Sequence, residues 1–526
     1  MTVNHCAKLF FWASNTMFST SFYIIIFAVC ALVTKFGVDA YCQLAPKLGL
    51  VDHPDINRKL HEKPIAVGGG VVIFCVTFFA VFVLAMIAKK NVEQPLYAMK
   101  SLLPLLIAAT MTVSIGLMDD KWGMNGKMKL FFQILASSIV IFFAGAYSKI
   151  SAFGMTIELG HFFYPIGVFW LVGMINSVNL LDGADGVSVT VGFLMVVAAG
   201  IIALINGYMV LLCVALIFSG SLLGFFCCNR PPAKVYLGDT GSMLIGLVAA
   251  MLLLRVCSTN NFSINIVPPL AIALIPILDS VYAVVRRINA GRSIFTPDRG
   301  HIHHRLQEKV GKGYQLLGIL ALLVLPGCIA AIVGVTCQND WIPVLVILGV
   351  IGIATTTGVF GREEVRLLVH RMMNQYKKCF RVKSYEERGE VFHFQGTGPW
   401  LALWEDFIAS LQSMECVKAH LDINMPFLHE DYSSEWKNMD LQDQKEFYLE
   451  FSLPLTYENQ CIGRLKMTFD NRTSSTFALL YQANELYILC TKYIGDYVRQ
   501  QKHALPTSPN YLKEDKTAKK PSLIAK

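Results

Sequence analysis

Acidic residues recur in this chain at the ends of long apolar segments, where they could bind a cation or handle protons. Asp119 and Asp120 are adjacent, Asp182 and Asp185 are three residues apart, and Asp239 precedes a further apolar stretch. Carboxylates are costly near a bilayer and are usually functional when they recur there. A helix cap or an ordinary interface residue would explain any one of them, but three distant segments together favour a shared site.

The segment NSVNLLDGADG has the donor atoms that a hard cation prefers. Asn176, Asn179, Asp182 and Asp185 follow at spacings of three, so on a helix they would share one face, and two glycines would then end the helix. Oxygen donors of this kind suit Mg²⁺, which keeps waters and substrate phosphates as its other ligands, with Mn²⁺ as a substitute. An Asx-rich turn is the simpler alternative.

The adjacent acids Asp119 and Asp120 could share a cation or hold one proton between them. Lys127 and Lys129 follow closely and could balance the charge of a phosphate. An interface cap is the alternative for the acid pair.

Asp239 lies in the segment VYLGDTGS, at the expected start of a helix. Thr240 and Ser242 stand where they could cap that helix. A simple cap is therefore the alternative to a functional role for this segment.

Two basic segments are candidates for phosphate binding. The first, with Arg58, His61 and Lys63, runs into three glycines at 68–70 that would let backbone approach closely. A positively charged cytoplasmic loop and a helix-packing glycine patch would explain the same residues.

The second basic segment is PDRGHIHHR, with charged forks suited to phosphate. Its candidate ligand-binding residues are Arg299, His301, His303 and His304. Zinc is the competing ligand, but no cysteine lies near.

Long apolar segments must position these residues. The chain has 526 residues, of which 54% are hydrophobic and only 16% are charged, and its mean hydropathy is +0.50. This composition predicts a polytopic membrane protein. Eleven candidate transmembrane helices follow at 22–37, 68–88, 101–118, 130–146, 162–178, 187–205, 210–226, 242–256, 266–284, 314–335 and 342–360.

The connecting loops alternate in charge. Those that carry the candidate residues are rich in Lys and Arg, whereas the opposite loops hold few. The positive-inside rule therefore places the candidate residues and the C-terminus in the cytoplasm and the N-terminus outside. The net charge of +8 reflects this topology and predicts no nucleic-acid binding.

Fourteen cysteines are scattered without CxxC spacing, which predicts buried apolar side chains and no metal or redox pair. The first apolar segment lacks a clear small-residue cleavage site and is expected to be a retained helix.

The sequence after the last span is of a different kind. We expect an N-terminal segment 1–21, a transmembrane domain 22–360, a basic juxtamembrane linker 361–389, a cytoplasmic α/β domain 390–502 and a disordered tail 503–526. Within the α/β domain, a helix at 400–414, a strand at 417–423, a hairpin of 447–453 with 462–467 and a helix at 475–500 are predicted. This domain faintly resembles a GAF-type sensory domain; a stabilising appendage is the alternative.

Five motifs together carry a stronger resemblance. The segments GLMDD, NSVNLLDGADG, VYLGDTGS and PDRGHIHHRL, after RKLHEKP and GGG, closely resemble the polyprenyl-phosphate N-acetylhexosamine-1-phosphate transferases of the glycosyltransferase family 4 type. The resemblance covers 48–306, although Ala66 stands where the family commonly repeats Pro. The PDRGHIHH form is similar to the undecaprenyl-phosphate GlcNAc-1-phosphate branch. The phospho-N-acetylmuramoyl-pentapeptide transferase branch shows three adjacent His and remains an alternative.

The resemblance implies a reaction and roles. A bacterial inner-membrane enzyme would transfer a sugar-1-phosphate from a UDP-sugar to undecaprenyl phosphate and release UMP, and a homodimer is the family's expectation. It implies Mg²⁺ held by Asn179 and Asp239, an acceptor phosphate activated or oriented by Asp119, and a nucleotide pocket flanked by Asp182 and Asp185.

Further roles follow from the same resemblance. Asp120 would support the metal or Lys129, and the histidine segment would grip the sugar-phosphate or the pyrophosphate. Direct attack and a covalent aspartyl intermediate both stay open.

A multi-pass transporter is the alternative from another class. Its ionisable residues should lie near the midplane of the membrane on broken helices, within an internal repeat. Here they gather at one face, and no repeat is apparent, which favours the enzyme.

Overall fold

The computed structural model describes residues 19–52, 64–91, 95–143, 148–258, 263–289, 293, 300–311, 313–357, 391–395, 398–412, 416–425, 428, 430–438, 448–457, 460–470 and 476–504. The chain divides into two compact units, Met1–Met373 and Asn374–Lys526. The predicted linker 361–389 and nearly all of the predicted tail lie outside the described residues, as do Arg58, His61, Lys63 and Arg299.

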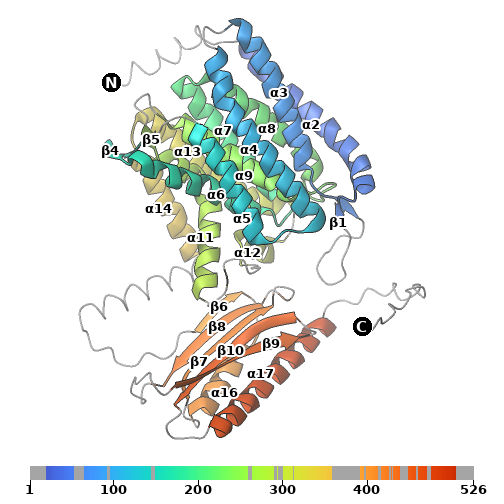
Figure 1. The fold of residues 1–526 in the computed structure, drawn as a ribbon, viewed down its shortest axis with the longest axis vertical. Helices are drawn as coiled ribbons and strands as arrows, with labels where there is room; N and C mark the ends of the chain where they lie inside the picture. The colour runs from blue at the N-terminus through green and yellow to red at the C-terminus, as the bar shows by residue number, and fades with distance from the viewer. Residues whose placement is uncertain are drawn as a thin grey trace, which may run out of the picture. The chain divides into compact units, whose positions relative to one another are not determined.

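The first unit is a bundle of helices (Figure 1). Its helices are α2 (Thr20–Leu48), α3 (Gly70–Asn91), α4 (Pro95–Trp122), α5 (Gly126–Phe143), α6 (Phe163–Leu181), α7 (Val187–Asn206), α8 (Met209–Asn229), α9 (Gly238–Val256), α10 (Val267–Ile272), α11 (Leu274–Asn289), α12 (Ile302–Val310), α13 (Tyr314–Cys337) and α14 (Trp341–Thr356).

Each of the eleven predicted spans falls on one or more of these helices. Within the described residues, eight helices are long and apolar enough to cross a membrane, and two apolar helices, Gly70–Met86 and Trp341–Thr356, are shorter. A membrane protein with many spans is therefore confirmed, whereas the count of eleven stays a prediction.

Helix α9 is the centre of this unit. It packs against α3, α4, α6 and α7. Of the residues in its apolar 18-residue stretch, 83% are buried, whereas the corresponding share for the outer helix α2 is 17%. Figure 1 shows α9 among the other helices. A side chain at the start of α9 is therefore surrounded by several helix ends.

Glycines allow α3 and α4 to approach the start of α9 closely. A Cβ atom on Gly70 would lie 2.2 Å from the Cα atom of Gly241, and one on Gly116 would lie 2.5 Å from the Cα atom of Thr240. Small residues at helix contacts are typical of membrane bundles. Of the two interpretations of the glycines at 68–70, helix packing thus accounts for Gly70.

The predicted span 266–284 is divided. Helix α10 ends at Ile272, and α11 begins at Leu274 and continues to Asn289. Pro276, in the first turn of α11, has no N–H with which to continue the hydrogen bonds of α10, which is the physical reason for the break.

Two small sheets lie at the ends of the bundle. Strands β1 (Val51–Asp52) and β2 (Ile65–Ala66) pair at the end where α4 stops and α5 starts, and the N–H of Tyr236 donates to the carbonyl of Ala66 at 2.8 Å. The second sheet has the order β4-β3-β5 (Met155–Glu158, Lys149–Ala152, Ser263–Asn265). It lies at the other end, because β3 and β4 follow α5.

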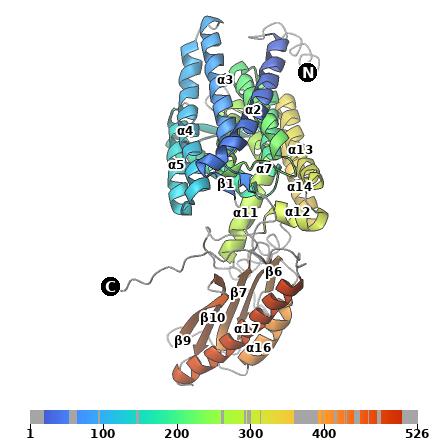
Figure 2. The same ribbon diagram turned by 90° about the vertical axis from the view of Figure 1, so that its right-hand side faces the viewer.

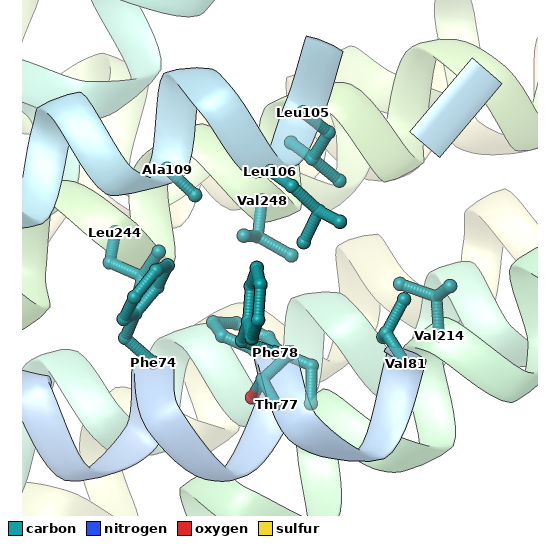
Figure 3. A pocket seen from close by; sticks show the side chains of 11 residues that line it. Phe74, Thr77, Phe78, Val81, Leu105, Leu106, Ala109, Val214, Leu244 and Val248 are labelled. Atoms are coloured by element: carbon teal, nitrogen blue, oxygen red, sulfur yellow. The ribbon is translucent and has the colours of Figure 1, made fainter. Parts of the chain in front are cut away.

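An apolar pocket lies inside the bundle between α3, α4, α8 and α9 (Figure 3). Phe74 and Phe78 of α3 point into it, opposite Leu106 and Val248, and Thr77 is the single polar residue among those that line it. This pocket offers no charge to a phosphorylated substrate, so the candidate active site must lie elsewhere.

The second unit is a sheet covered on one face by two helices (Figure 2). Its antiparallel strands have the order β6-β8-β7-β10-β9, with bounds Val391–Gln395, Glu430–Lys437, Cys416–Met425, Gln460–Asp470 and Tyr448–Tyr457. Helices α16 (Trp400–Gln412) and α17 (Thr476–Ala504) cover the sheet. The buried carboxylate of Glu430 accepts from the Trp400 indole at 2.7 Å and from the Tyr497 hydroxyl at 2.6 Å, which joins β8 to both helices.

Five elements of this unit, α16, β7, β9, β10 and α17, agree with the prediction, and two strands, β6 and β8, were not predicted. Strand β8 has the polar sequence EDYSSEWK, but Tyr432 and Trp436 alternate onto its buried face. Helix α17 ends at Ala504, four residues beyond the predicted end. The likeness to a GAF-type domain stays a prediction.

Candidate active site

The predicted acidic residues meet at one end of the bundle. Asp119 and Asp120 lie in the last turn of α4, and Lys129 lies in the first turns of α5. Asn179 lies in the last turn of α6, and Asp239 lies in the first turn of α9. Successive helices cross the bundle in alternate directions, which brings these ends together.

Lys129 joins two of the acids. Its ammonium group binds the carboxylate of Asp239 and lies 2.9 Å from Oδ2 of Asp119. The side chains of Lys129 and Asp119 are 13% exposed, so this ion pair is largely shielded from water. Because all three residues are charged and close, they form one electrostatic unit.

Asn179 binds the same carboxylate from another side. Its amide Nδ2 donates to Oδ1 of Asp239 at 2.6 Å and to Oγ of Ser242 at 2.9 Å. Asn176, one turn earlier, donates instead to Oε1 of Gln133 at 2.7 Å. The expectation of a common helical face for the four polar residues is therefore wrong, because α6 ends at Leu181 and Asn176 faces α5.

Asp120 caps helix α9 across the bundle. Its carboxylate accepts from the N–H groups of Asp239 at 2.8 Å and Thr240 at 3.1 Å, and from the Thr240 hydroxyl at 2.5 Å. The expectation that Thr240 and Ser242 cap their own helix is wrong, because the hydroxyl of Ser242 donates to the carbonyl of Gly238. A helix start inside a bundle needs an acceptor for its free N–H groups, and a carboxylate also suits the helix dipole.

Asp182 and Asp185 lie in the turn between α6 and α7. Asp185 accepts from the N–H of Ala233 at 3.0 Å, which ties this turn to the segment before α9. Burial, and then the charge of Asp239, raise the pKa of Asp182 to about 8. Such a group of acids favours the approach of a cation.

Asn229, which sequence reasoning did not select, supports the same turn. Its Oδ1 atom accepts from the N–H of Gly186 at 3.1 Å, and its Nδ2 atom donates to the carbonyl of Val235 at 2.7 Å. Gly186 has φ +74°, a conformation that glycine adopts without strain. The position of Asn229 at the end of α8 is the feature of the sequence that could have indicated this role.

The histidine segment begins α12. His303 is buried against the acidic turn, since a Cβ atom on Gly183 would lie 2.1 Å from its Nε2 atom. Among the described residues, neither ring nitrogen of His303 has a hydrogen-bond partner, and burial lowers the pKa of His303 well below its ordinary value. The rings of His303 and His304 are 4.1 Å apart between centroids. A neutral imidazole here is able to accept or donate a hydrogen bond to a bound molecule.

The donor atoms of this site fit a Mg²⁺ ion that is bound partly by the protein and partly by the substrate. Among the described residues, no three His, Cys, Asp or Glu side chains converge as a closed metal site requires. Mg²⁺ needs fewer protein ligands, because it is commonly bound by one or two carboxylates together with waters and substrate phosphates. Asp239 supplies such a carboxylate and Asn179 lies against it; their role as metal ligands stays a prediction.

The fold and this site define a class: a multi-pass membrane protein with charged groups gathered at one end of an apolar bundle. Residues 102–257, which include most of the site, match the family described as glycosyl transferase family 4.

Individual proteins with similar sequences point to the same family. The chain is 32% identical over 288 residues to a probable undecaprenyl-phosphate N-acetylglucosaminyl 1-phosphate transferase of Bacillus subtilis, covering 54% of this chain and 76% of the relative. It is 31% identical over 329 residues to an undecaprenyl-phosphate alpha-N-acetylglucosaminyl 1-phosphate transferase of Yersinia pestis, covering 61% and 84%. A phospho-N-acetylmuramoyl-pentapeptide-transferase of Streptococcus pneumoniae is 28% identical over 304 residues, covering 54% and 88%.

This chain belongs to glycosyl transferase family 4, and it is a multi-pass membrane transferase. The resemblance drawn from the five motifs is therefore confirmed at the level of the family.

Proposed function

We propose that this protein transfers N-acetylhexosamine-1-phosphate from a UDP-sugar to undecaprenyl phosphate, releasing UMP. The product would be the first lipid-linked intermediate of a cell-envelope polysaccharide. One observation carries the proposal: Asp119, Lys129, Asn179 and Asp239 meet at the end of an apolar bundle, where a lipid phosphate and a water-soluble nucleotide could both arrive. The names of the relatives supply the lipid and the sugar.

Charge is the main obstacle to this reaction. The lipid phosphate must approach the β-phosphorus of the UDP-sugar, and two anions repel by several kcal/mol in a medium of low dielectric constant. Catalysis of phosphoryl transfer is largely positioning and charge neutralisation. Lys129 would contribute positive charge beside both phosphates. When bound by Asp239 and Asn179, Mg²⁺ would neutralise the pyrophosphate and the departing UMP.

Asp119 is the candidate for orienting the lipid phosphate or accepting its proton. Its Oδ1 atom already accepts from the N–H of Met124 at 2.6 Å, and its Oδ2 atom faces Lys129, so the carboxylate is held in place. A phosphate has a second pKa of about 6, so a strong base is not required.

His303 is a candidate for substrate binding beside the acidic turn. A buried imidazole with two unpaired nitrogens costs free energy unless a ligand pairs with it. A sugar hydroxyl or a phosphate oxygen would do so. We assign His303, His304 and the turn of Asp182 and Asp185 to binding of the nucleotide sugar.

The test is direct. Purified full-length protein in detergent would receive undecaprenyl phosphate, Mg²⁺ and one donor at a time: UDP-GlcNAc, UDP-GalNAc or UDP-N-acetylmuramoyl-pentapeptide. We expect UMP release and a lipid-linked N-acetylhexosamine phosphate identified by mass. A product from the pentapeptide donor alone would establish the peptidoglycan alternative. Folded protein that yields no lipid product with any donor would contradict the proposal.

The cellular location is part of the proposal. We place the acidic end of the bundle on the cytoplasmic side of a bacterial inner membrane, with the N-terminus outside. UDP-sugars are then available to the site from the cytosol.

A further inference from the structure

Asp279 is a buried carboxylate on α11 that belongs to none of the five motifs. Its side chain is 2% exposed. Its Oδ2 atom lies 3.0 Å from Nδ1 of His301, and its Oδ1 atom accepts from the N–H of Ile302 at 2.8 Å. Asp279 therefore binds both the first histidine of the segment and the first turn of α12.

These contacts decide where the proton of His301 lies. An ionised carboxylate only accepts hydrogen bonds, so Nδ1 of His301 must carry the hydrogen that it shares with Asp279. In a neutral ring, Nε2 is then the acceptor.

The same contacts set the position of the neighbouring histidines. The rings of His301 and His303 are nearly parallel, with centroids 6.0 Å apart and planes 5° apart. His303 in turn lies against Gly183 in the acidic turn. A shift of His301 would therefore move His303 relative to that turn.

We propose that Asp279 is a positioning residue of the transferase: it holds His301 in the Nδ1–H tautomer and thereby places His303 and His304 beside the acidic turn. The inference rests on the proposed function, because it takes the histidine segment as part of the substrate pocket. Substituting a carboxylate that orients a metal-ligating histidine typically costs ten- to hundredfold in metal affinity or activity, and we expect a loss of about this size for the orientation of His301.

A purely structural role is the competing explanation, since Asp279 also caps α12. Asp279→Asn separates the two. The asparagine keeps one oxygen, which is able to accept from Ile302, but it presents an NH₂ group to His301. That group donates, so His301 would have to accept at Nδ1 and carry its proton on Nε2. A cap alone would survive this change, whereas the tautomer would not.

The experiment measures lipid product from UDP-GlcNAc and undecaprenyl phosphate with full-length wild type, D279N, H301A and the double variant. S280A is the matched control, because the neighbouring Ser280 hydroxyl is buried, has no hydrogen-bond partner among the described residues and belongs to none of the contacts of the site. We expect D279N to unfold at the wild-type temperature and to lose about ten- to hundredfold in kcat/KM. S280A should keep wild-type activity.

The double variant shows whether Asp279 acts through His301. If it does, D279N should cause little further loss in the H301A background. Wild-type activity in D279N, or an equal loss in both backgrounds, would overturn the inference. Inactive wild-type protein would instead count against the proposed function.

A measurement on the wild type keeps the inference testable if D279N does not fold. The ¹⁵N spectrum of protein labelled at histidine should show His301 with its proton on Nδ1, assigned by the loss of its signals in H301A. A His301 signal from the Nε2–H tautomer would overturn the inference.

Discussion

Asp239 receives contacts from three helices, since Lys129 and Asn179 bind its carboxylate and Asp120 binds its N–H. Charge on Asp239 thus serves both the ammonium group of Lys129 and the proposed cation. Asp120 has a different role, because both of its carboxylate oxygens already accept hydrogen bonds from the first residues of α9. These two acids, which come from different motifs, therefore differ in what a substitution should change.

Asp239→Asn should lower turnover by orders of magnitude without unfolding the protein, because size is kept while a hard, charged ligand is lost. Lys129 would keep Asp119 as its partner, so no buried charge is left alone. UMP release across a series of Mg²⁺ concentrations measures the effect. Near-normal turnover with unchanged Mg²⁺ dependence would show that Asp239 is not a metal ligand.

Asp120→Ala should destabilise the protein as well as reduce its activity. The change leaves two N–H groups and the Thr240 hydroxyl without their acceptor, at a cost of roughly 1–3 kcal/mol for each group that stays unpaired. Asp120→Asn keeps one oxygen and should have a smaller effect. We expect the thermal unfolding temperature in detergent to fall from the wild type to Asp120→Asn and further to Asp120→Ala. Equal unfolding temperatures would show that Asp120 does not stabilise the start of α9.

At the scale of elements, close helix contacts place the site. Helices α3 and α4 meet the start of α9 through Gly70, Gly116 and Gly241, and α4 carries the acid pair to that point. Separation of these helices would move Asp119 and Asp120 away from Asp239. The glycines therefore matter to the geometry of the site although they contact no substrate.

Gly70→Ala and Gly116→Ala should each destabilise the bundle by about 1–3 kcal/mol and reduce activity, because the new methyl group meets backbone that cannot turn away. Gly173→Ala in α6 is the matched control, since no atom of another described segment lies within 4 Å of its Cβ position. Unfolding temperature and transferase activity are measured together. Equal behaviour of the three variants would contradict close packing at α9.

At the scale of the whole molecule, orientation decides whether the site faces the cytosol. Reporter fusions after Lys90, Gly207 or Asn339 should read as outside, and fusions after Gly126, Lys234, Lys312 or Gly389 should read as inside. The reason is the excess of Lys and Arg in the second group of loops. A reversed pattern would separate the acids from cytosolic UDP-sugar.

The second unit has its own core, with Trp400, Trp404 and Phe407 of α16 fully buried, and it contributes none of the predicted site residues. A chain truncated near Ser384 should therefore keep measurable transferase activity in detergent. Activity is compared with the full chain at equal amounts of folded protein. If the truncated protein inserts and folds but makes no lipid product, the second unit takes part in catalysis.

Much of this protein follows from its sequence alone. Apolar stretches of sufficient length must cross a membrane, and their alternation brings the acids of α4, α6 and α9 to one end. The order of the motifs along the chain is sufficient to indicate the family. These features depend on local composition and on order along the chain, which a single sequence contains.

Tertiary structure decided which groups bind each other. Lys129 and Asp239 are 110 residues apart, and their pairing depends on how α5 and α9 are rotated. Helix packing likewise determines that Asp120 caps α9, that Asn176 donates to Gln133 and that Asp279 contacts His301. Strand β8 became part of the sheet through its neighbours β6 and β7. Hydrophobic periodicity places a residue on a helix, but only packing between distant segments determines what that residue faces.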